Sequence, residues 1–113
     1  LYRRRQRQMC IRDRINSLCF IINNKLAYLP DSNGIYKKDF SKFKSLQYMI
    51  VDCLRYTKHP SHFNFEDIIK LNFFLKPKKM ILTNLHSDLD YSELLDILPK
   101  NIKPAYDGLS INI

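Results

Sequence analysis

Three histidines and one aspartate of this 113-residue chain have side chains of types that can bind metal ions, and each stands just beyond an apolar run. The histidines, His59, His62 and His86, fall within a span of 28 residues. Asp31 follows an earlier apolar run, directly after a proline. Imidazole nitrogens and carboxylate oxygens that converge in space are the usual ligands of zinc and manganese. If the apolar runs are strands of an α/β sheet, their ends are where such a sheet binds its ligands.

Each of these residues also has an ordinary structural interpretation. Asp31 precedes Ser-Asn-Gly and could be a turn residue. His59 and His62 could cap a helix or lie in solvent, and His86 could belong to a polar loop. Three further carboxylates could orient histidine rings by accepting hydrogen bonds from them: Asp52, Asp88 and Asp90. Asp90 also suits a helix cap.

The elements that must position these residues form an α/β pattern. The run 48–53 is nearly continuous and typical of a strand covered on both faces. Asn23 and Asn24 tolerate the positive φ that a two-residue hairpin turn needs. Asn64 and Asp67 have the spacing of a helix N-cap. Strands are expected over 17–22, 25–29, 48–53 and 80–83, with a last strand in 102–113, and helices over 39–46, 64–75 and 91–97.

The first 14 residues differ from the rest in their basic side chains. They hold six arginines and one aspartate, a net charge of +5 out of +8, which leaves +3 for residues 15–113. Those later residues carry twelve lysines and a single arginine, Arg55. A basic arm could bind nucleic-acid phosphates. Alternatively, Met9 to Asp13 correspond to ATG TGT ATA AGA GAC, which resembles a transposon adapter. We therefore expect 1–14 to be a non-native segment and 15–113 to be the domain.

Cysteine spacing and hydropathy bound the environment of the chain. The three cysteines form no CxxC pair, so the sequence indicates neither a zinc ribbon nor a disulfide framework. No run of about 18 apolar residues exists, so no transmembrane helix is expected. A reducing cytoplasm fits these features, and the sequence gives no reason to expect a membrane partner.

Four segments, in order along the chain, carry a resemblance to a known family. Leu29-Pro30-Asp31-Ser32-Asn33 is similar to the strand-end Pro-Asp motif of metallo-β-lactamase-fold hydrolases. The other three resemble the branch of that fold that contains phosphoribosyl 1,2-cyclic phosphate phosphodiesterases. Together the four matches cover nearly all of 17–113. The three segments that resemble this branch are 50–55 with 59–63, 81–91 and 104–111.

The resemblance implies a fold and a role for each candidate residue. The fold would be the C-terminal part of an αββα sandwich, incomplete here. Asp31 would be the carboxylate shared by two metals, and His86 the last histidine ligand of the second metal. His62 would contact the substrate phosphate or protonate the leaving oxygen, with His59 as the other choice. The cofactors would be two divalent metals, zinc or manganese.

Two departures from the family pattern limit what this chain is expected to do alone. Many relatives contain Thr-His-x-x-His where this chain has Thr83-Asn84-Leu85-His86. The family's His-x-His-x-Asp-His motif has no counterpart in 1–113, nor has the further histidine that follows it. The N-terminal strands and helices of the sandwich are also missing, so an uncovered sheet face and an aggregation hazard are expected.

The sequence therefore predicts a fragment of a dinuclear-metal hydrolase that is itself inactive. The resemblance implies that the intact parent is a phosphodiesterase whose substrate is a small cyclic phosphate ester, and it leaves a homodimer of the parent open. Two alternatives come from other classes. One is a nucleic-acid-binding module based on the arginines of 1–14, which the charge distribution disfavours. The other is a non-catalytic α/β remnant in which the histidines are loop residues.

Overall fold

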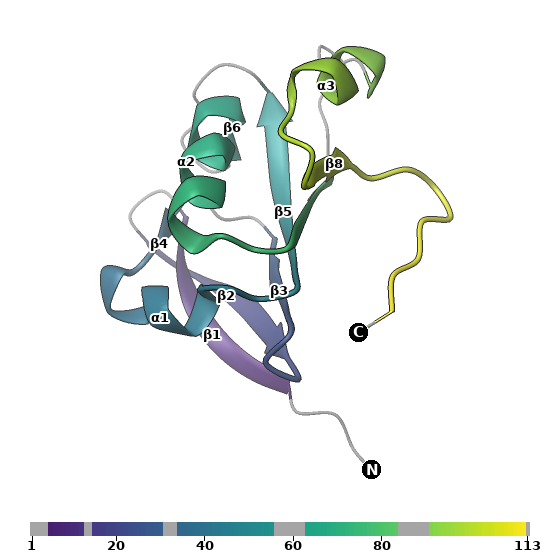
Figure 1. Cartoon of the computed structure of the whole chain (residues 1–113). Coiled ribbons are helices and arrows are strands. Elements are labelled where there is room, and N and C mark those ends of the chain that lie inside the picture. Colours follow the sequence, from purple (N-terminus) through teal and green to yellow (C-terminus); the bar gives the residue numbers. More distant parts are fainter. Residues whose placement is uncertain (1–4, 13–14, 31–33, 56–62, 84–90, 113) are drawn as a thin grey trace.

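The structure is a computed structural model that describes residues 5–12, 15–30, 34–55, 63–83 and 91–112. The described strands and helices follow one another in a mixed α/β order (Figure 1). The strands are β1 (Arg5–Arg12), β2 (Ile15–Ile22), β3 (Leu26–Leu29), β4 (Gly34–Ile35), β5 (Tyr48–Arg55), β6 (Phe63–Asn64), β7 (Lys79–Thr83) and β8 (Ile102–Pro104). The helices are the short 3-10 helix η1 (Lys37–Asp39), α1 (Phe40–Phe43), α2 (Phe65–Leu75) and α3 (Tyr91–Ile97).

One sheet organises the molecule, with strands in the order β4-β1-β2-β3-β5-β7-β8, and β6 beside β5 off this path. The strands from β4 to β3 pair antiparallel, whereas β3, β5, β7 and β8 pair parallel. Helices α1 and α2 lie on one side of the sheet, and the segment after β8 runs over the other side (Figure 1). The α/β class expected from the sequence is thus confirmed, and the parallel half contains the strands that precede the candidate residues.

The turn between β2 and β3 forms where two asparagines were expected to make it. Asn23 and Asn24 both have φ of 55°. The amide of Lys25 donates a hydrogen bond of 3.0 Å to the carbonyl of Ile22. The turn is one residue longer than predicted, because β3 begins at Leu26 and pairs there with Ile22. Asparagine accepts this left-handed backbone at little cost, so it ends one strand and begins the next.

Alternation along the parallel strands divides the side chains between two faces. Met49 and Val51 are fully buried and belong to the same core as Ile68 and Leu75 of α2. The intervening Ile50 points to the other face and is only half-buried. The apolar run 48–53 was expected to be covered on both faces of the sheet. Within the described residues, the face toward α2 is the better covered of the two.

Helix α2 begins as predicted. The side chain of Asn64 accepts a 2.8 Å hydrogen bond from the amide of Asp67, whose carboxylate in turn accepts one of 3.2 Å from the amide of Asn64. This reciprocal capping box satisfies two amides that the helix itself cannot use. The helix ends at Leu75, before Lys76 in a left-handed conformation and Pro77. The other two helices and the last strand also form, the first helix as η1 and α1.

The N-terminal segment contains a feature that the sequence did not indicate. Cys10 of β1 and Cys19 of β2 are fully buried and joined by a disulfide. Cys10 lies opposite Ser17, so Cys19 is its diagonal neighbour on the same face, with the Cα atoms 6.1 Å apart. Such diagonal neighbours are within reach of a disulfide. The interpretation that the cysteine spacing indicates no disulfide is therefore corrected. It was wrong because residues 1–14 were excluded from the domain, which removed Cys10 itself from consideration.

Candidate functional site

The candidate site lies at one edge of the sheet, where three neighbouring parallel strands end. Leu29 of β3 is in register with Val51 of β5, which is in register with Leu82 of β7. Because parallel strands end on the same side, the chain leaves all three strands at the same edge.

No helix in the described part of the chain is long and apolar enough to span a membrane.

The four candidate residues named from the sequence lie in the segments that follow these strand ends. Asp31 follows β3, His59 and His62 follow β5, and His86 follows β7, and all four lie outside the described residues. Asp88 and Asp90, which were considered as orienting carboxylates, also lie outside them. The topology places β3, β5 and β7 side by side with their carboxyl ends toward one edge of the sheet, and β5 continues to Arg55, beyond its last pairing with β7 at Asp52.

Among the residues that the structure does describe, Asp52 and Thr83 form the polar contact at this edge. They face each other across β5 and β7. The hydroxyl of Thr83 donates a 2.9 Å hydrogen bond to Oδ1 of Asp52 and lies 3.3 Å from the carbonyl oxygen of Val51. Asp52 is 5% exposed. Sequence reasoning named Asp52 but gave Thr83 no function. A signal in the sequence could have found Thr83. The apolar runs that form β5 and β7 each end in a polar residue, and parallel pairing of the two runs places these polar residues opposite each other.

The described residues do not themselves assemble a metal site. No group of three or more histidine, cysteine, aspartate or glutamate side chains within them is arranged to hold a metal ion. Carboxylate and imidazole are nevertheless the donor types of Asp31 and His86, and those types suit zinc or manganese. The described part of the chain contains the strands β3 and β7 that precede these two residues.

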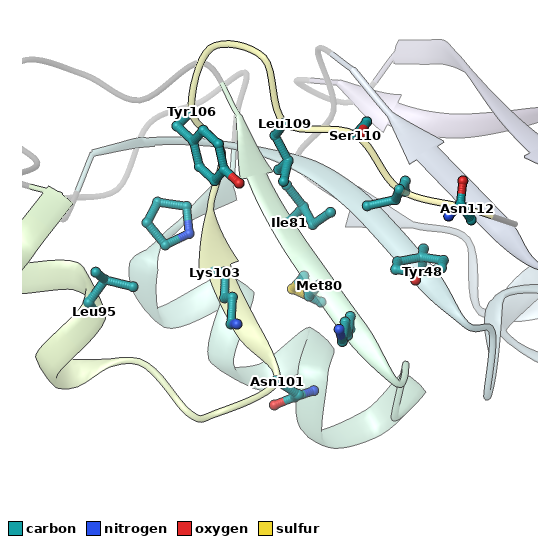
Figure 2. A pocket seen from close by; sticks show the side chains of 13 residues that line it. Tyr48, Met80, Ile81, Leu95, Asn101, Lys103, Tyr106, Leu109, Ser110 and Asn112 are labelled. Carbon is teal, nitrogen blue, oxygen red and sulfur yellow. The ribbon is translucent and has the colours of Figure 1, made fainter.

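A cavity of about 440 Å³ lies elsewhere, between the segment after β8 and the face of the sheet away from α2. Figure 2 shows Tyr106 and Leu109 of that segment on one side and Ile81, Met80 and Lys103 on the other. The cavity also reaches residues where β7 and β8 begin, at the opposite end of the strands from the candidate site. It therefore does not form part of the candidate site.

Solved structures with the same arrangement identify the fold, whereas no protein-family model matches the chain. A diphosphatase of the PhnP family superposes with a TM-score of 0.89 and 25% identity, over 95% of this chain and 42% of that one. The short form of human tRNase Z superposes with a TM-score of 0.70 and 15% identity, over 96% of this chain and 43% of that one. The metallo-β-lactamase-fold protein YhfI from Bacillus subtilis superposes with a TM-score of 0.75 and 13% identity, over 95% of this chain and 48% of that one. This chain thus spans less than half of each of these proteins.

These similarities define the class of protein. The chain has the metallo-β-lactamase fold of metal-dependent hydrolases and corresponds to part of such a domain. Within that fold, the chain is similar in sequence and in structure to the PhnP-family diphosphatase, with 25% identity and a TM-score of 0.89.

A curated relative has a different name and must be weighed by its coverage. The Octanoyltransferase of Porphyromonas gingivalis (strain ATCC BAA-308 / W83) is 32% identical in an 87-residue alignment that covers 75% of this chain and 18% of the relative. The chain spans less than a fifth of its length, so that protein's name does not give this chain an activity.

Proposed function

We propose that this chain is the C-terminal part of a dinuclear-metal phosphodiesterase that hydrolyses a small cyclic phosphate ester. The observation that carries the proposal is the common edge at which β3, β5 and β7 end, each followed by a carboxylate or histidine of the right type. The similarity to a PhnP-family diphosphatase supports hydrolysis at phosphorus, because that solved protein shares both the fold and a quarter of its aligned residues.

This chain would supply only part of the ligand set of the two metals. Asp31 and His86 are the residues that would help to hold them, through a carboxylate and a ring nitrogen. Two ligands are too few for a dinuclear centre, so the other ligands would come from sequence beyond these 113 residues. We therefore expect the chain alone to be inactive.

In the intact parent, each candidate side chain would have a separate task. The bound metals would supply a hydroxide near neutral pH and neutralise charge on the phosphoryl oxygens. Asp31 would help to hold the metals. His62 would contact a phosphate oxygen or donate a proton to the leaving alkoxide, and His59 is the alternative for that role.

The direct test uses the full-length protein that carries residues 15–113, purified with zinc or manganese. We expect bound divalent metal and turnover of bis-p-nitrophenyl phosphate or of cyclic ribose phosphates. Asp31→Asn and His86→Ala should reduce metal content, whereas Asn112→Ala, at an exposed position near the C-terminus, should not. A protein that binds the metals but hydrolyses none of these esters would contradict the proposed activity.

We also propose that residues 1–14 are not native to the domain. The abrupt change from arginine to lysine after Arg14 supports this, although Arg5–Arg12 form β1 and pair with β2. Sequencing the native locus from a library made without transposon adapters decides the point. An in-frame His-x-His-x-Asp-His upstream of Ile15 is the expected result.

A basic-arm nucleic-acid module is the competing proposal, and the charge of 1–14 is the observation that favours it. It predicts binding that falls steeply with salt and depends on Arg3, Arg4, Arg5 and Arg7. If deletion of 1–14 leaves nucleic-acid binding unchanged, this competing proposal is excluded.

A further inference from the structure

Six lysines gather at the amino ends of the parallel strands, at the opposite end of the sheet from the candidate site. They lie in the four segments that lead into β3, β5, β7 and β8, which are residues 23–25, 44–47, 76–79 and 98–101. These four segments contain no acidic residue. All six lysines are exposed, and together they form what we call the lysine row: Lys25, Lys44, Lys76, Lys78, Lys79 and Lys100.

Backbone hydrogen bonds and strand pairing place the four segments beside one another. The amide of Tyr48 donates a 3.0 Å hydrogen bond to the carbonyl of Lys25, and β5 pairs with β7 from Tyr48 and Lys79 onward. The amide of Met80 donates one of 2.8 Å to the carbonyl of Asn101. Because neighbouring strands lie about 4.8 Å apart, the four segments form a line of about 14 Å. The lysines therefore belong to one surface.

The positive charge of this surface is not neutralised by acidic side chains. In the described part of the chain, Lys42 and Lys70 form salt bridges with Asp39 and Glu66, whereas none of the six lysines forms one. Residues 15–113 have a net charge of +3, so the six lysines leave −3 for the rest of the domain (3 minus 6). The small net charge thus hides a strong separation of charge.

Lys76 occupies a position where the backbone favours glycine. Its φ of 50° and ψ of 52° are the left-handed conformation that ends α2. Glycine is the usual residue there, because a side chain makes this conformation costly. A positive charge does stabilise a helix C-terminus, but that effect is confined to the last turn and does not account for Lys25, Lys44 or Lys100. The row as a whole therefore indicates a binding role.

We propose that the lysine row is a binding surface for the phosphate backbone of nucleic acid. Ammonium groups in a line neutralise phosphates and release their counterions, which favours binding. None of the exposed large apolar side chains of the described residues lies in the four segments, so the row lacks the apolar groups that would anchor it in a membrane. Contacts to phosphates carry no sequence information, so binding should depend little on base sequence.

This surface is separate from the candidate metal site and does not depend on the proposed hydrolase activity. It also differs from the basic arm, whose arginines would bind the same ligand. The test therefore uses the 113-residue chain with the four arginines of the arm changed to glutamine, in a background that carries Arg3→Gln, Arg4→Gln, Arg5→Gln and Arg7→Gln. Nucleic-acid binding that survives in this background cannot come from those arginines.

Two variants in that background remove charge from the row. The triple variant carries Lys44→Gln, Lys78→Gln and Lys100→Gln. Lys76→Gly removes a single charge at a position whose backbone suits glycine, so its melting temperature should not fall. A loss of binding in Lys76→Gly therefore cannot be attributed to unfolding.

The matched control removes three charges from exposed lysines outside the row. It carries Lys37→Gln and Lys38→Gln in η1 and Lys70→Gln in α2. Its net charge equals that of the triple variant, so the two differ only in where the charges are removed. Any effect of overall charge should be the same in both.

Binding of a short fluorescein-labelled DNA duplex is measured by fluorescence anisotropy over a range of salt concentrations, with melting temperatures alongside. The triple variant should bind about tenfold more weakly, and its slope of log affinity against log salt should fall by about 2 to 3. Lys76→Gly should weaken binding by a smaller factor, and the control should bind like the background.

Three results would overturn the proposal. The first is a background chain that no longer binds the duplex, which would assign binding to the arm. The second is an equal loss of affinity in the triple variant and the control. The third is a background chain that cosediments with vesicles of phosphatidylserine and phosphatidylcholine but does not bind the duplex, which would make the partner a membrane surface.

Discussion

At the scale of single residues, polar side chains in this chain are placed where the backbone leaves groups unsatisfied. Asn64 and Asp67 serve the first amides of α2, and Asn23 and Asn24 adopt the backbone that the β2–β3 turn requires. Asp52 differs, because it is buried within β5 at the last residue that pairs with β7. The polar residues of the first kind act on stability.

The cap of α2 gives a prediction at this scale. Asn64→Ala removes the side-chain oxygen that accepts from the amide of Asp67 at 2.8 Å. The loss should reduce the free energy of unfolding by about 1 kcal/mol. Urea denaturation followed by circular dichroism measures it, with Ser41→Ala, at an exposed position, as the control. A variant as stable as the wild type would show that the cap contributes little.

The β2–β3 turn gives a second prediction. Asn24 has φ of 55°, which a β-branched residue adopts only at a cost. Asn24→Val should therefore destabilise the chain by about 1–2 kcal/mol, whereas Asn24→Gly should leave it near wild type. Thermal melts of the two variants are compared side by side. Equal melting temperatures would mean that the turn relaxes without the left-handed backbone.

At the scale of elements, prediction from sequence succeeded where a pattern is local. The capping box, the asparagine turn and the apolar runs of β5 and β7 depend on residues close together in the chain, and all were located. The strands β1, β4 and β6 were missed because short or polar strands depend on distant partners, and β1 lay in the segment set aside. The candidate site was predictable as a set of strand ends. The Asp52–Thr83 contact was not, since it joins residues 31 apart in sequence.

The packing of the parallel strands gives a third prediction. Leu82 is fully buried in the core that also contains Val51 and Ile68. Leu82→Ala should cost about 2–5 kcal/mol, because the cavity it leaves cannot close completely. Such a loss is a large part of the stability of a small domain. Leu95→Ala, at a site that is 46% exposed on α3, should cost much less in the same denaturation experiment.

At the scale of the whole molecule, the disulfide ties the first strand to the sheet. Cys10 and Cys19 are separated by nine positions, so the bond closes a short loop. Reduction with dithiothreitol should lower stability by about 2–3 kcal/mol, because the unfolded chain regains freedom. The melting temperature of a Cys10→Ser variant should not respond to dithiothreitol. A wild type that melts at the same temperature under both conditions would show that the disulfide does not stabilise the fold.

The two faces of the sheet are unequally covered, and this should govern how the chain behaves in solution. Helices α1 and α2 cover one face, whereas on the other Leu18 and Tyr28 are 41% and 39% exposed. The described strands β2 and β3 carry no charged residue that would oppose contact with another molecule. We therefore expect the isolated chain to self-associate through this face.

Sedimentation velocity over a range of concentrations tests this. The double variant Leu18→Lys and Tyr28→Lys should shift the chain toward monomer, because the added charges would face each other in any complex formed through this surface. Phe73→Lys, at a residue that is 70% exposed on the outer side of α2, is the matched control and should leave association unchanged. The opposite pattern would place self-association on the helical face. In the full-length parent the Leu18 and Tyr28 variants should instead impair folding, since the remaining half of the sandwich would cover the same apolar face.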